Sequence, residues 1–284
     1  GILDLQQAGL PVVTTIHHPI SRDLSVALAG ASGWRARLLV RRWHSFLTMQ
    51  TRVAAQLNHI VTVSSASAAD IATDFGVLPN AIQVIPNGVD TELFRALPDV
   101  TRKSDQLIAT ASADAPLKGL AVLLQAFKLL SVDRPALQLM LIASPKPGGD
   151  TEALISQLQL GDRIHFVGGV SHADIVRLYA ESTVAVVPSL YEGFGLPAVE
   201  AMASGIPLVS SDGGALAEVV GDGGLLVPAG DAKALAEAID AVLSDAGLAA
   251  ELINRGQQRA HRTFSWSVCA RLMVEQYQRC IDLC

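Results

Sequence analysis

Short apolar runs alternate with amphipathic stretches along most of the chain. Each run is too short for a buried helix and is rich in valine, isoleucine or leucine, which is typical of a strand buried in a parallel sheet. The expected strands are residues 11–16, 60–63, 82–85, 107–110, 137–143, 164–167, 184–188, 206–210 and 225–227. Helix-period patterns lie between them. This rhythm predicts an α/β protein whose parallel sheets carry helices on both faces.

Two stretches interrupt the rhythm and indicate how the chain is divided. Residues 92–105 are polar and contain Pro98, so we read them as a linker. We therefore expect one domain over residues 1–98 and a second over residues 99–262. The end of the chain, 263–284, is expected to form a helix that packs back towards the first domain. A Gly/Ala/Ser-rich stretch at 22–33 predicts a mobile loop.

Local signals place several helix starts and one long helix. Ser67 is expected to cap a helix over 68–75, and Asp231 one over 232–244. A single helix is expected from Trp34 to about Gln56, carrying tryptophan and several arginines. Such a helix can contact an anionic membrane or an anionic acceptor. A solvated helix face would give the same pattern, and the sequence leaves both open.

The charge is unevenly distributed. The net charge of −6 combines +4 over the first 60 residues with −10 over the remainder. The overall balance therefore argues against nucleic acid as a partner. No apolar stretch is long enough and free enough of charge to span a membrane.

The cysteines and the first residues bear on location. Three cysteines lie near the end of the chain without the spacing of a metal site, which favours reduced thiols and a cytoplasmic protein, in contact with a membrane if the basic helix binds one. The chain opens on Gly1 within a helical pattern. We expect it to lack its true N-terminus, so a separate N-terminal fragment is a possible partner.

The stretch from Pro188 to Gly205 carries the strongest candidate chemistry. A buried strand runs into a turn bracketed by Gly193 and Gly195, and Pro197 then suits the first position of a helix. Free N–H groups and the helix dipole make such a turn an anion site. Because Glu192 and Glu200 would repel a phosphate, their partners should be neutral hydroxyls beside it. Phosphate flanked by hydroxyls describes a nucleotide sugar.

A second candidate, His17, follows the strand at 11–16. Ligands of open parallel sheets bind at the carboxyl ends of strands, so a histidine there is well placed for chemistry. A strand-end histidine bonded to a loop carbonyl is the competing interpretation.

The stretch from Glu192 to Glu200, with its two glutamates eight positions apart, resembles the donor-site signature of retaining glycosyltransferases of family 4, which have the GT-B fold. Supporting segments occur in the expected order and cover nearly the whole chain: Val-Val-Thr-Thr-Ile-His17, Val-Thr-Val-Ser-Ser65, Val-Ile-Pro-Asn-Gly-Val-Asp90, Leu-Lys118-Gly119, His-Phe-Val-Gly168 and Gly213-Gly214-Ala-Leu-Ala-Glu218. The resemblance implies two Rossmann-like domains, the N-terminal one incomplete.

The resemblance also implies a role for each site residue. Glu192 would bind hydroxyls of the donor sugar, and Glu200 those of the ribose. Lys118 would neutralise the diphosphate, whose charge grows as the sugar departs. His17 would lie under the donor sugar. The turn glycine Gly193, the backbone N–H groups of Phe194, Gly195 and Leu196 and the backbone around Val167 and Gly168 complete the expected donor site.

Three of these charged residues could instead have roles outside ligand binding. Glu200 could be a solvated helix residue, Lys118 a surface lysine, and Glu218 a capping or hinge residue rather than a ligand. The family has no known metal requirement, and the sequence offers no metal cluster, so we expect neither a metal nor another cofactor.

The implied reaction is transfer, with retention, from a UDP- or GDP-sugar to an unidentified hydroxyl acceptor, which the basic helix suggests is lipid-linked. This sequence departs from the family pattern in two ways. Relatives carry a diphosphate-binding arginine where this chain has Ala113, and the resemblance implies that about the first third of the fold lies outside this sequence. A non-catalytic binding fragment or half of a split enzyme is therefore the alternative, and a GT-B epimerase a weaker one.

Overall fold

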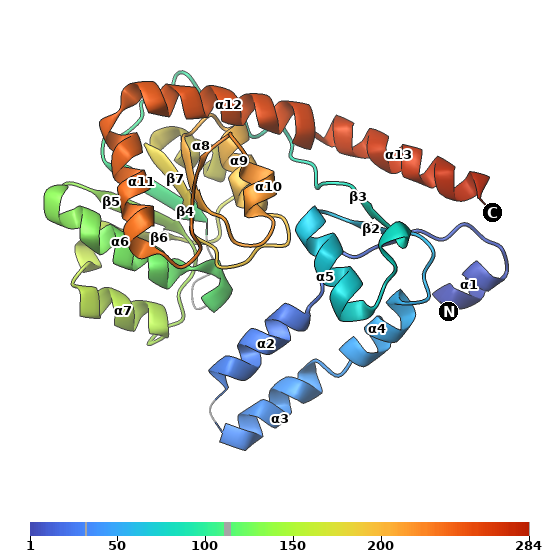
Figure 1. Cartoon of the computed structure of the whole chain (residues 1–284). Helices are drawn as coiled ribbons and strands as arrows, with labels where there is room; N and C mark the ends of the chain where they lie inside the picture. The colour runs from blue at the N-terminus through green and yellow to red at the C-terminus, as the bar shows by residue number, and fades with distance from the viewer. Residues whose placement is uncertain (32, 111–114, 284) are drawn as a thin grey trace. The chain divides into compact units, whose positions relative to one another are not determined.

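The computed structural model describes residues 1–31, 33–110 and 115–283 (Figure 1). Contacts divide the chain into two compact units. The first comprises Gly1–Asn87 with Cys269–Cys284, and the second comprises Gly88–Val268. The boundary thus lies ahead of the one at 98–99 that the sequence predicts. Val89 accounts for the difference, because it bridges to Ser265 within the second unit.

The first unit contains a small parallel sheet. Among the described residues, β1 (Thr14–Thr15), β2 (Ile60–Thr62) and β3 (Ile82–Val84) pair in that order. The helices are α1 (Ile2–Gln7), α2 (Ser21–Gly30), α3 (Gly33–Trp43), α4 (Leu47–Ala54), α5 (Ser65–Phe75), the short η1 (Pro79–Ala81) and the part of α13 (Trp266–Asp282) from Cys269 onward. Ile60 and Ile71, fully buried, form the centre of the core.

Three local predictions in this unit are wrong. The stretch 22–33 is not a loop, because its alanines and leucines favour the helix α2, which ends at Gly30, and α3 begins at Gly33. The single helix over 34–56 is two, α3 and α4, separated at residues 44–46. Ser67 does not cap α5; Ser64 does, since its hydroxyl accepts a hydrogen bond from the backbone N–H of Ser67 at 2.9 Å.

The second unit is built on a larger parallel sheet. Its strands are β4 (Gln106–Thr110), β5 (Gln138–Ile142), β6 (Ile164–Val167), β7 (Val184–Val187), β8 (Leu208–Ser211) and β9 (Leu225–Val227). The described strands lie in the order β6-β5-β4-β7-β8-β9. This is the strand order of a dinucleotide-binding fold. Successive strands are added outward in one direction from β4 and in the opposite direction from β7, while all strands stay parallel. The predicted Rossmann-like architecture is confirmed.

The helices of the second unit follow the strands in the predicted alternation. They are η2 (Pro116–Lys118), α6 (Leu120–Asp133), α7 (Asp150–Leu158), η3 (Gly161–Arg163), α8 (His172–Glu181), α9 (Leu196–Ala203), α10 (Leu216–Val220), α11 (Ala232–Ser244) and α12 (Ala246–Phe264). α6 packs on α7 and α11, whereas α9 packs on α10 and α12. Right-handed crossovers that run outward from β4 and from β7 place these two groups on opposite faces of the sheet.

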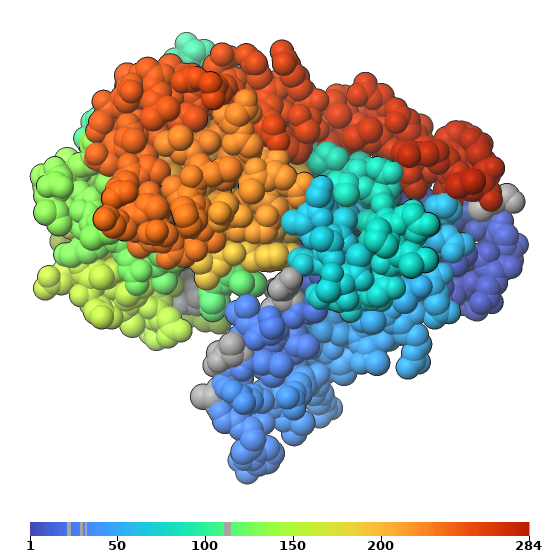
Figure 2. All heavy atoms as spheres, viewed as in Figure 1, coloured from blue at the N-terminus to red at the C-terminus, as the bar shows by residue number. Residues whose placement is uncertain are grey.

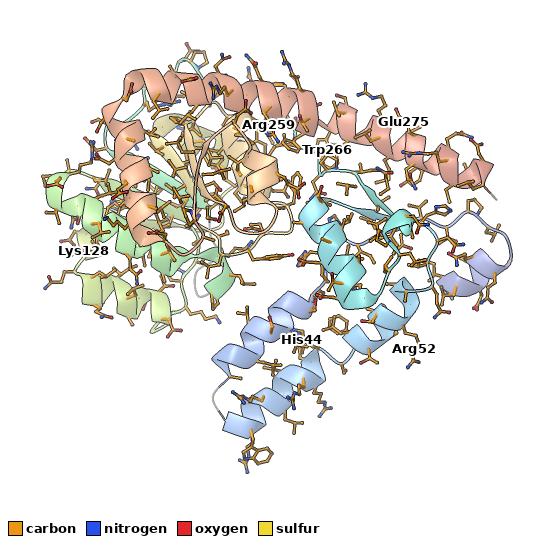
Figure 3. The ribbon with its side chains drawn as sticks, in the orientation of Figure 1. His44, Arg52, Lys128, Arg259, Trp266 and Glu275 are labelled. Carbon is orange, nitrogen blue, oxygen red and sulfur yellow. The ribbon has the colours of Figure 1, made fainter. Side chains whose placement is uncertain are left out.

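Hydrogen bonds at helix ends hold two helices of the second unit. Asp231 caps α11 as predicted, since its carboxylate accepts hydrogen bonds from the N–H groups of Lys233 and Ala234. The helix α12 has no counterpart among the predicted elements. The guanidinium group of Arg259, a residue of α12 that Figure 3 labels, donates to the carbonyls of Glu218 and Val219 at the end of α10. These bonds satisfy carbonyls that a helix end leaves without partners.

Candidate active site

The candidate site lies where the strand order of the second sheet reverses. β4 and β7 are neighbours, and the crossovers that leave them run in opposite directions. In open parallel sheets this arrangement leaves a crevice outside the carboxyl ends of the two strands, where ligands bind. The segments that follow β4 and β7 contain Lys118 and Glu192, two of the three residues, with His17, that the sequence predicts to be catalytic.

The structure brings Lys118 and Glu192 together. The Lys118 ammonium donates to Oε1 of Glu192 at 2.8 Å. The hydroxyl of Ser189 donates to the same oxygen, also at 2.8 Å. The Glu192 side chain is only 12% exposed, whereas that of Lys118 is 37% exposed. A shielded carboxylate and an accessible ammonium therefore stand side by side at the edge of the sheet.

Close backbone contacts hold the two segments against each other. The Leu190 N–H donates to the carbonyl of Leu117 at 2.8 Å. Gly119 has φ of +65°, and a Cβ built on it would lie 1.9 Å from the carbonyl oxygen of Pro188. Only glycine satisfies both conditions. The Lys118 segment is thus fixed against the Glu192 segment by its backbone, independently of their ion pair.

A third segment, after β8, closes against the same turn. Glu192 and Gly214 form an isolated parallel bridge, and the Ala215 N–H donates to the Glu192 carbonyl at 2.9 Å. A Cβ on Gly214 would lie 2.4 Å from that carbonyl oxygen. The Ser211 hydroxyl also donates to the Ser189 carbonyl. The turn that carries Glu192 is therefore supported from both sides.

The start of α9 has the backbone geometry of an anion site. Gly195 is the N-cap with φ of +96°, and a Cβ there would lie 2.5 Å from the Leu216 side chain. Leu196 occupies the first helical position, one ahead of the predicted Pro197. The neighbouring Phe194 is buried and packs edge-on against Phe264, with ring centroids 5.6 Å apart. The phenylalanine thereby anchors the turn, while the first N–H groups of the helix have no intrahelical acceptor.

Glu200 lies within α9 in a partly buried environment. Burial raises the pKa of its carboxyl group above the ordinary value, and the nearby His172 acts in the opposite direction. Beneath it lies Tyr179, whose hydroxyl is within 3.3 Å of the Thr110 hydroxyl and donates to the Pro197 carbonyl at 3.4 Å. Burial, followed by the charge of Glu200, raises the pKa of Tyr179, so this phenol stays protonated.

The segment predicted to hold the base follows β6. Val167 is the last residue of that strand, and its carbonyl accepts a hydrogen bond from the Ala143 N–H at 3.1 Å. A Cβ on Gly168 would lie 2.3 Å from the Ser144 hydroxyl. The ends of β5 and β6 therefore meet at Gly168 and Ser144, at the same carboxyl edge of the sheet as Lys118.

His17 belongs to the first unit, where it follows β1. Its side chain is exposed, and its carbonyl accepts a weak hydrogen bond from the Thr62 hydroxyl at 3.4 Å. The residue thus lies at the carboxyl edge of the first sheet, as the sequence predicts for its position. Its catalytic role stays a prediction. Ala113, where relatives carry an arginine, falls outside the described residues.

A family model described as "Glycosyl transferases group 1" matches residues 98–259, more than half of the chain. The chain belongs to this family. A second model, "Glycosyltransferase Family 4", matches residues 1–93. Both the segment 192–200 and the segment at Lys118 lie inside the stretch that the first model matches.

Curated relatives of this glycosyltransferase include mannosyltransferases. It is 46% identical over 285 residues to an "MMP alpha-(1->4)-mannosyltransferase" of Mycolicibacterium hassiacum, an alignment that covers 99% of the chain and 68% of the relative. It is 29% identical to a "Phosphatidyl-myo-inositol mannosyltransferase" of Mycolicibacterium smegmatis, covering 98% of the chain and 67% of that protein. The protein is therefore a glycosyltransferase enzyme.

Solved structures agree on the architecture. A sucrose-phosphate synthase from Thermosynechococcus elongatus superposes with a TM-score of 0.79 at 27% identity, covering 99% of this chain and 71% of that one. HepE of Anabaena, solved in complex with UDP and glucose, superposes with a TM-score of 0.77 at 23% identity, covering 98% and 74%. This likeness confirms the GT-B fold of the glycosyltransferase.

The sequence did not indicate three further residues at the candidate site. Ser189, Thr110 and Tyr179 contribute hydroxyls around Glu192 and beneath α9. Ser189 follows Pro188 directly after β7, and Thr110 is the last residue of β4, so position at a strand end was the signal that could have found them. Tyr179 had no such signal, because its burial depends on the packing of α8 against β4.

Two absences apply to the described part of the chain. Among those residues, no three histidine, cysteine or acidic side chains gather as a metal site would require. No helix in the same ranges has the length and apolar character needed to cross a membrane.

Proposed function

We propose that this glycosyltransferase moves an α-mannosyl residue from a nucleoside diphosphate mannose, linked to UDP or GDP, to a hydroxyl acceptor with retention of configuration. The observation that carries the proposal is the Lys118–Glu192 pair at the carboxyl ends of β4 and β7. A cation for the diphosphate and a carboxylate for sugar hydroxyls stand within one hydrogen bond of each other. Mannose is chosen because two relatives are named mannosyltransferases.

The proposed chemistry breaks the bond between the sugar C1 and the phosphate oxygen, and both electrons leave with the diphosphate. The acceptor oxygen then forms a bond to C1 from the same face. Its proton passes to the departing phosphate. Lys118 and the N–H groups at the start of α9 stabilise the charge that builds on the leaving group, without a metal. Glu192 holds the sugar hydroxyls, and Glu200 holds those of the ribose.

Residues of three further segments complete the proposed site. The backbone at Val167 and Gly168 holds the base, where Gly168 leaves room beside Ser144. Gly193 and Gly195 keep the turn open to the donor. His17 supplies a polar group from the first unit near the reacting carbon. The missing arginine at Ala113 is expected to weaken diphosphate binding, because a charge-assisted contact contributes about 1.5–3 kcal/mol.

Donor turnover tests the proposal. The chain is incubated with UDP-mannose or GDP-mannose and a methyl α-mannoside acceptor, and nucleoside diphosphate release and product are measured together. We expect release with one of the two bases and an α-linked product by proton NMR. A β-linked product would overturn retention. Absence of product with both mannose donors, alongside product from a glucose donor, would overturn the choice of sugar.

We further propose an anionic membrane surface or lipid-linked acceptor as a partner of α3, with the enzyme in the cytoplasm. Two observations support this. α3, whose residues are among the blue atoms at the lower edge of Figure 2, buries none of its residues. Trp34 and Trp43 are 72% and 79% exposed among its arginines. Cys269 is a free and buried thiol, which is usual in reducing compartments. Exposed tryptophans between cations are typical of helices that lie in a membrane interface.

Vesicle sedimentation tests this partner. We expect binding to vesicles that contain phosphatidylserine and little binding to vesicles of phosphatidylcholine alone. The double substitution Arg41→Ser and Trp43→Ser should abolish it, whereas Arg255→Ser on α12 should not. Equal binding to both vesicle types, or equal loss with Arg255→Ser, would contradict the proposal.

A further inference from the structure

A cavity of about 480 Å³ lies in the first unit, at the amino ends of β2 and β3. It is on the edge of the sheet opposite to His17, which follows the carboxyl end of β1. Its walls come from the segment before β2, the segment around η1 and the end of α13: Ala55, Gln56, Leu57, Asn58, His59, Leu78, Asn80, Ala81, Ile82, Gln83, Gln276, Arg279 and Leu283. The volume falls within the roughly 300–1,000 Å³ of small-molecule sites.

Gln276 is the residue that marks this cavity as a binding site. Its side chain is 6% exposed and lines the cavity, yet no other described residue forms a hydrogen bond with its amide. By contrast Gln278, two positions along α13, is exposed and donates to Asp282 at 2.7 Å. The amide atoms are accessible from the cavity and are not sealed in the core, so a ligand there can reach both its oxygen and its nitrogen. A ligand in the cavity would supply that partner.

The wall segments are held in place by contacts outside the cavity. Gln6 of α1 donates to the Gln56 carbonyl at 2.8 Å and accepts from the Asn58 N–H at 2.9 Å. On the α13 side, the thiol of Cys280 lies 3.8 Å from the Val12 carbonyl. These contacts hold the parts of the first unit that form the cavity.

The lining selects a class of ligand. Asn58, Asn80 and Gln276 each present both donors and an acceptor, and the described lining contains no carboxylate. Leu57 and Ile82 add apolar surface. Arg279 is the one lysine or arginine of the described lining, so amides that both donate and accept outnumber the cations that an anion site would use. A ligand that offers hydroxyls as donors and acceptors, with C–H faces between them, satisfies every part of the wall, and that ligand is a saccharide.

We propose that this cavity is a second saccharide site, which binds a segment of a mannoside chain away from the site of transfer. The identity of the sugar rests on the proposed function, whereas the site itself rests on the cavity. Binding at a second site raises the effective concentration of a long acceptor near the enzyme. Its contribution should therefore grow with acceptor length.

Binding without donor tests the site. The probe is α-(1→4)-linked mannotetraose, titrated into the chain by calorimetry. Gln276→Leu keeps the buried volume and removes the amide, Asn80→Ala alters an exposed wall residue, and Gln278→Leu is the matched control on α13. We expect saturable binding that weakens at least tenfold in the first two variants and less than twofold in the control. Transfer to a methyl mannoside should stay unchanged in all three.

Each contrary result has a definite meaning. Binding that is unaltered in Gln276→Leu and Asn80→Ala, or absent in the unmodified chain, would overturn the saccharide site. Binding of inorganic phosphate that depends on Arg279, with none of the tetraose, would show an anion site instead and also overturn it. Because no donor is present, tetraose binding at the cavity together with failed mannosyl transfer would overturn the proposed function alone.

Discussion

The ammonium of Lys118 lies 2.8 Å from Oε1 of Glu192, although the two residues are 74 positions apart in the chain. Each satisfies the charge of the other before any donor arrives. A bound diphosphate must therefore share the lysine with the carboxylate. This competition makes the pair the most informative target for substitution.

Lys118→Met should reduce transfer by about 10²–10³-fold, which is the usual effect of removing one group that stabilises charge in the transition state. The apolar stem is retained, so the melting temperature should change little. Nucleoside diphosphate release measures the effect. Lys128→Met, on α6 in the same unit (Figure 3), is the control and should transfer at the original rate. Equal rates in the two variants would remove Lys118 from the site.

Glu192→Ala should abolish transfer with the fold intact, because the turn is also held by backbone contacts with Gly214 and Ala215. Ser189→Ala removes only one hydrogen bond to the same carboxylate oxygen, worth about 1.5–3 kcal/mol, so a roughly ten- to 150-fold loss is expected. Steady-state kinetics and circular dichroism on both variants would check this order. A greater loss in Ser189→Ala than in Glu192→Ala would contradict it.

Gly119→Ala should destabilise the second unit by about 2–4 kcal/mol, since the new methyl group would collide with the Pro188 carbonyl while the residue is held at positive φ. Gly148→Ala separates the two causes, since Gly148 has φ of +70° with nothing within 4 Å. It should lose only about 1–2 kcal/mol. Urea unfolding measures both, and similar losses would show that the contact with Pro188 contributes little.

Glu200→Gln should make the protein more stable at pH 8 and weaken donor binding. Burial raises the pKa of Glu200 in the folded state, so the loss of stability begins above the ordinary pKa and is complete above the folded-state pKa. Below the ordinary value of about 4.3 the carboxyl is neutral in both states, and the gain should vanish. Melting temperatures at pH 4 and pH 8 test the sign. A gain that is equal at the two pH values would exclude this cause.

The sheets could be predicted from the sequence because their strands are buried on both faces. Runs such as Val184–Val187 and Leu208–Ser211 have no polar alternation, and only a parallel sheet covered by helices buries them. The site followed from the same reasoning, since residues after such strands share one edge. The helix cap at Asp231 could also be predicted, because its carboxylate accepts hydrogen bonds from N–H groups only two and three residues away.

Features that depend on packing could not be predicted in this way. Both Ser64 and Ser67 suit a cap, and only the extended backbone at Ser64 decides between them. The helix α2 was hidden because glycine and serine outweighed its alanines in a composition argument. The Lys118–Glu192 pair was likewise inaccessible, since its geometry depends on the contact of Gly119 with Pro188.

The strand order has a consequence for the synthesis of this protein. β4 lies at the middle of the sheet beside β7, although β5 and β6 are made between them. A nascent chain that has exposed Lys118 therefore cannot complete the donor site until the ribosome has also released β7 and the turn at Glu192. Capture of a nucleotide by ribosome-bound chains of increasing length would thus report when the second unit closes during translation.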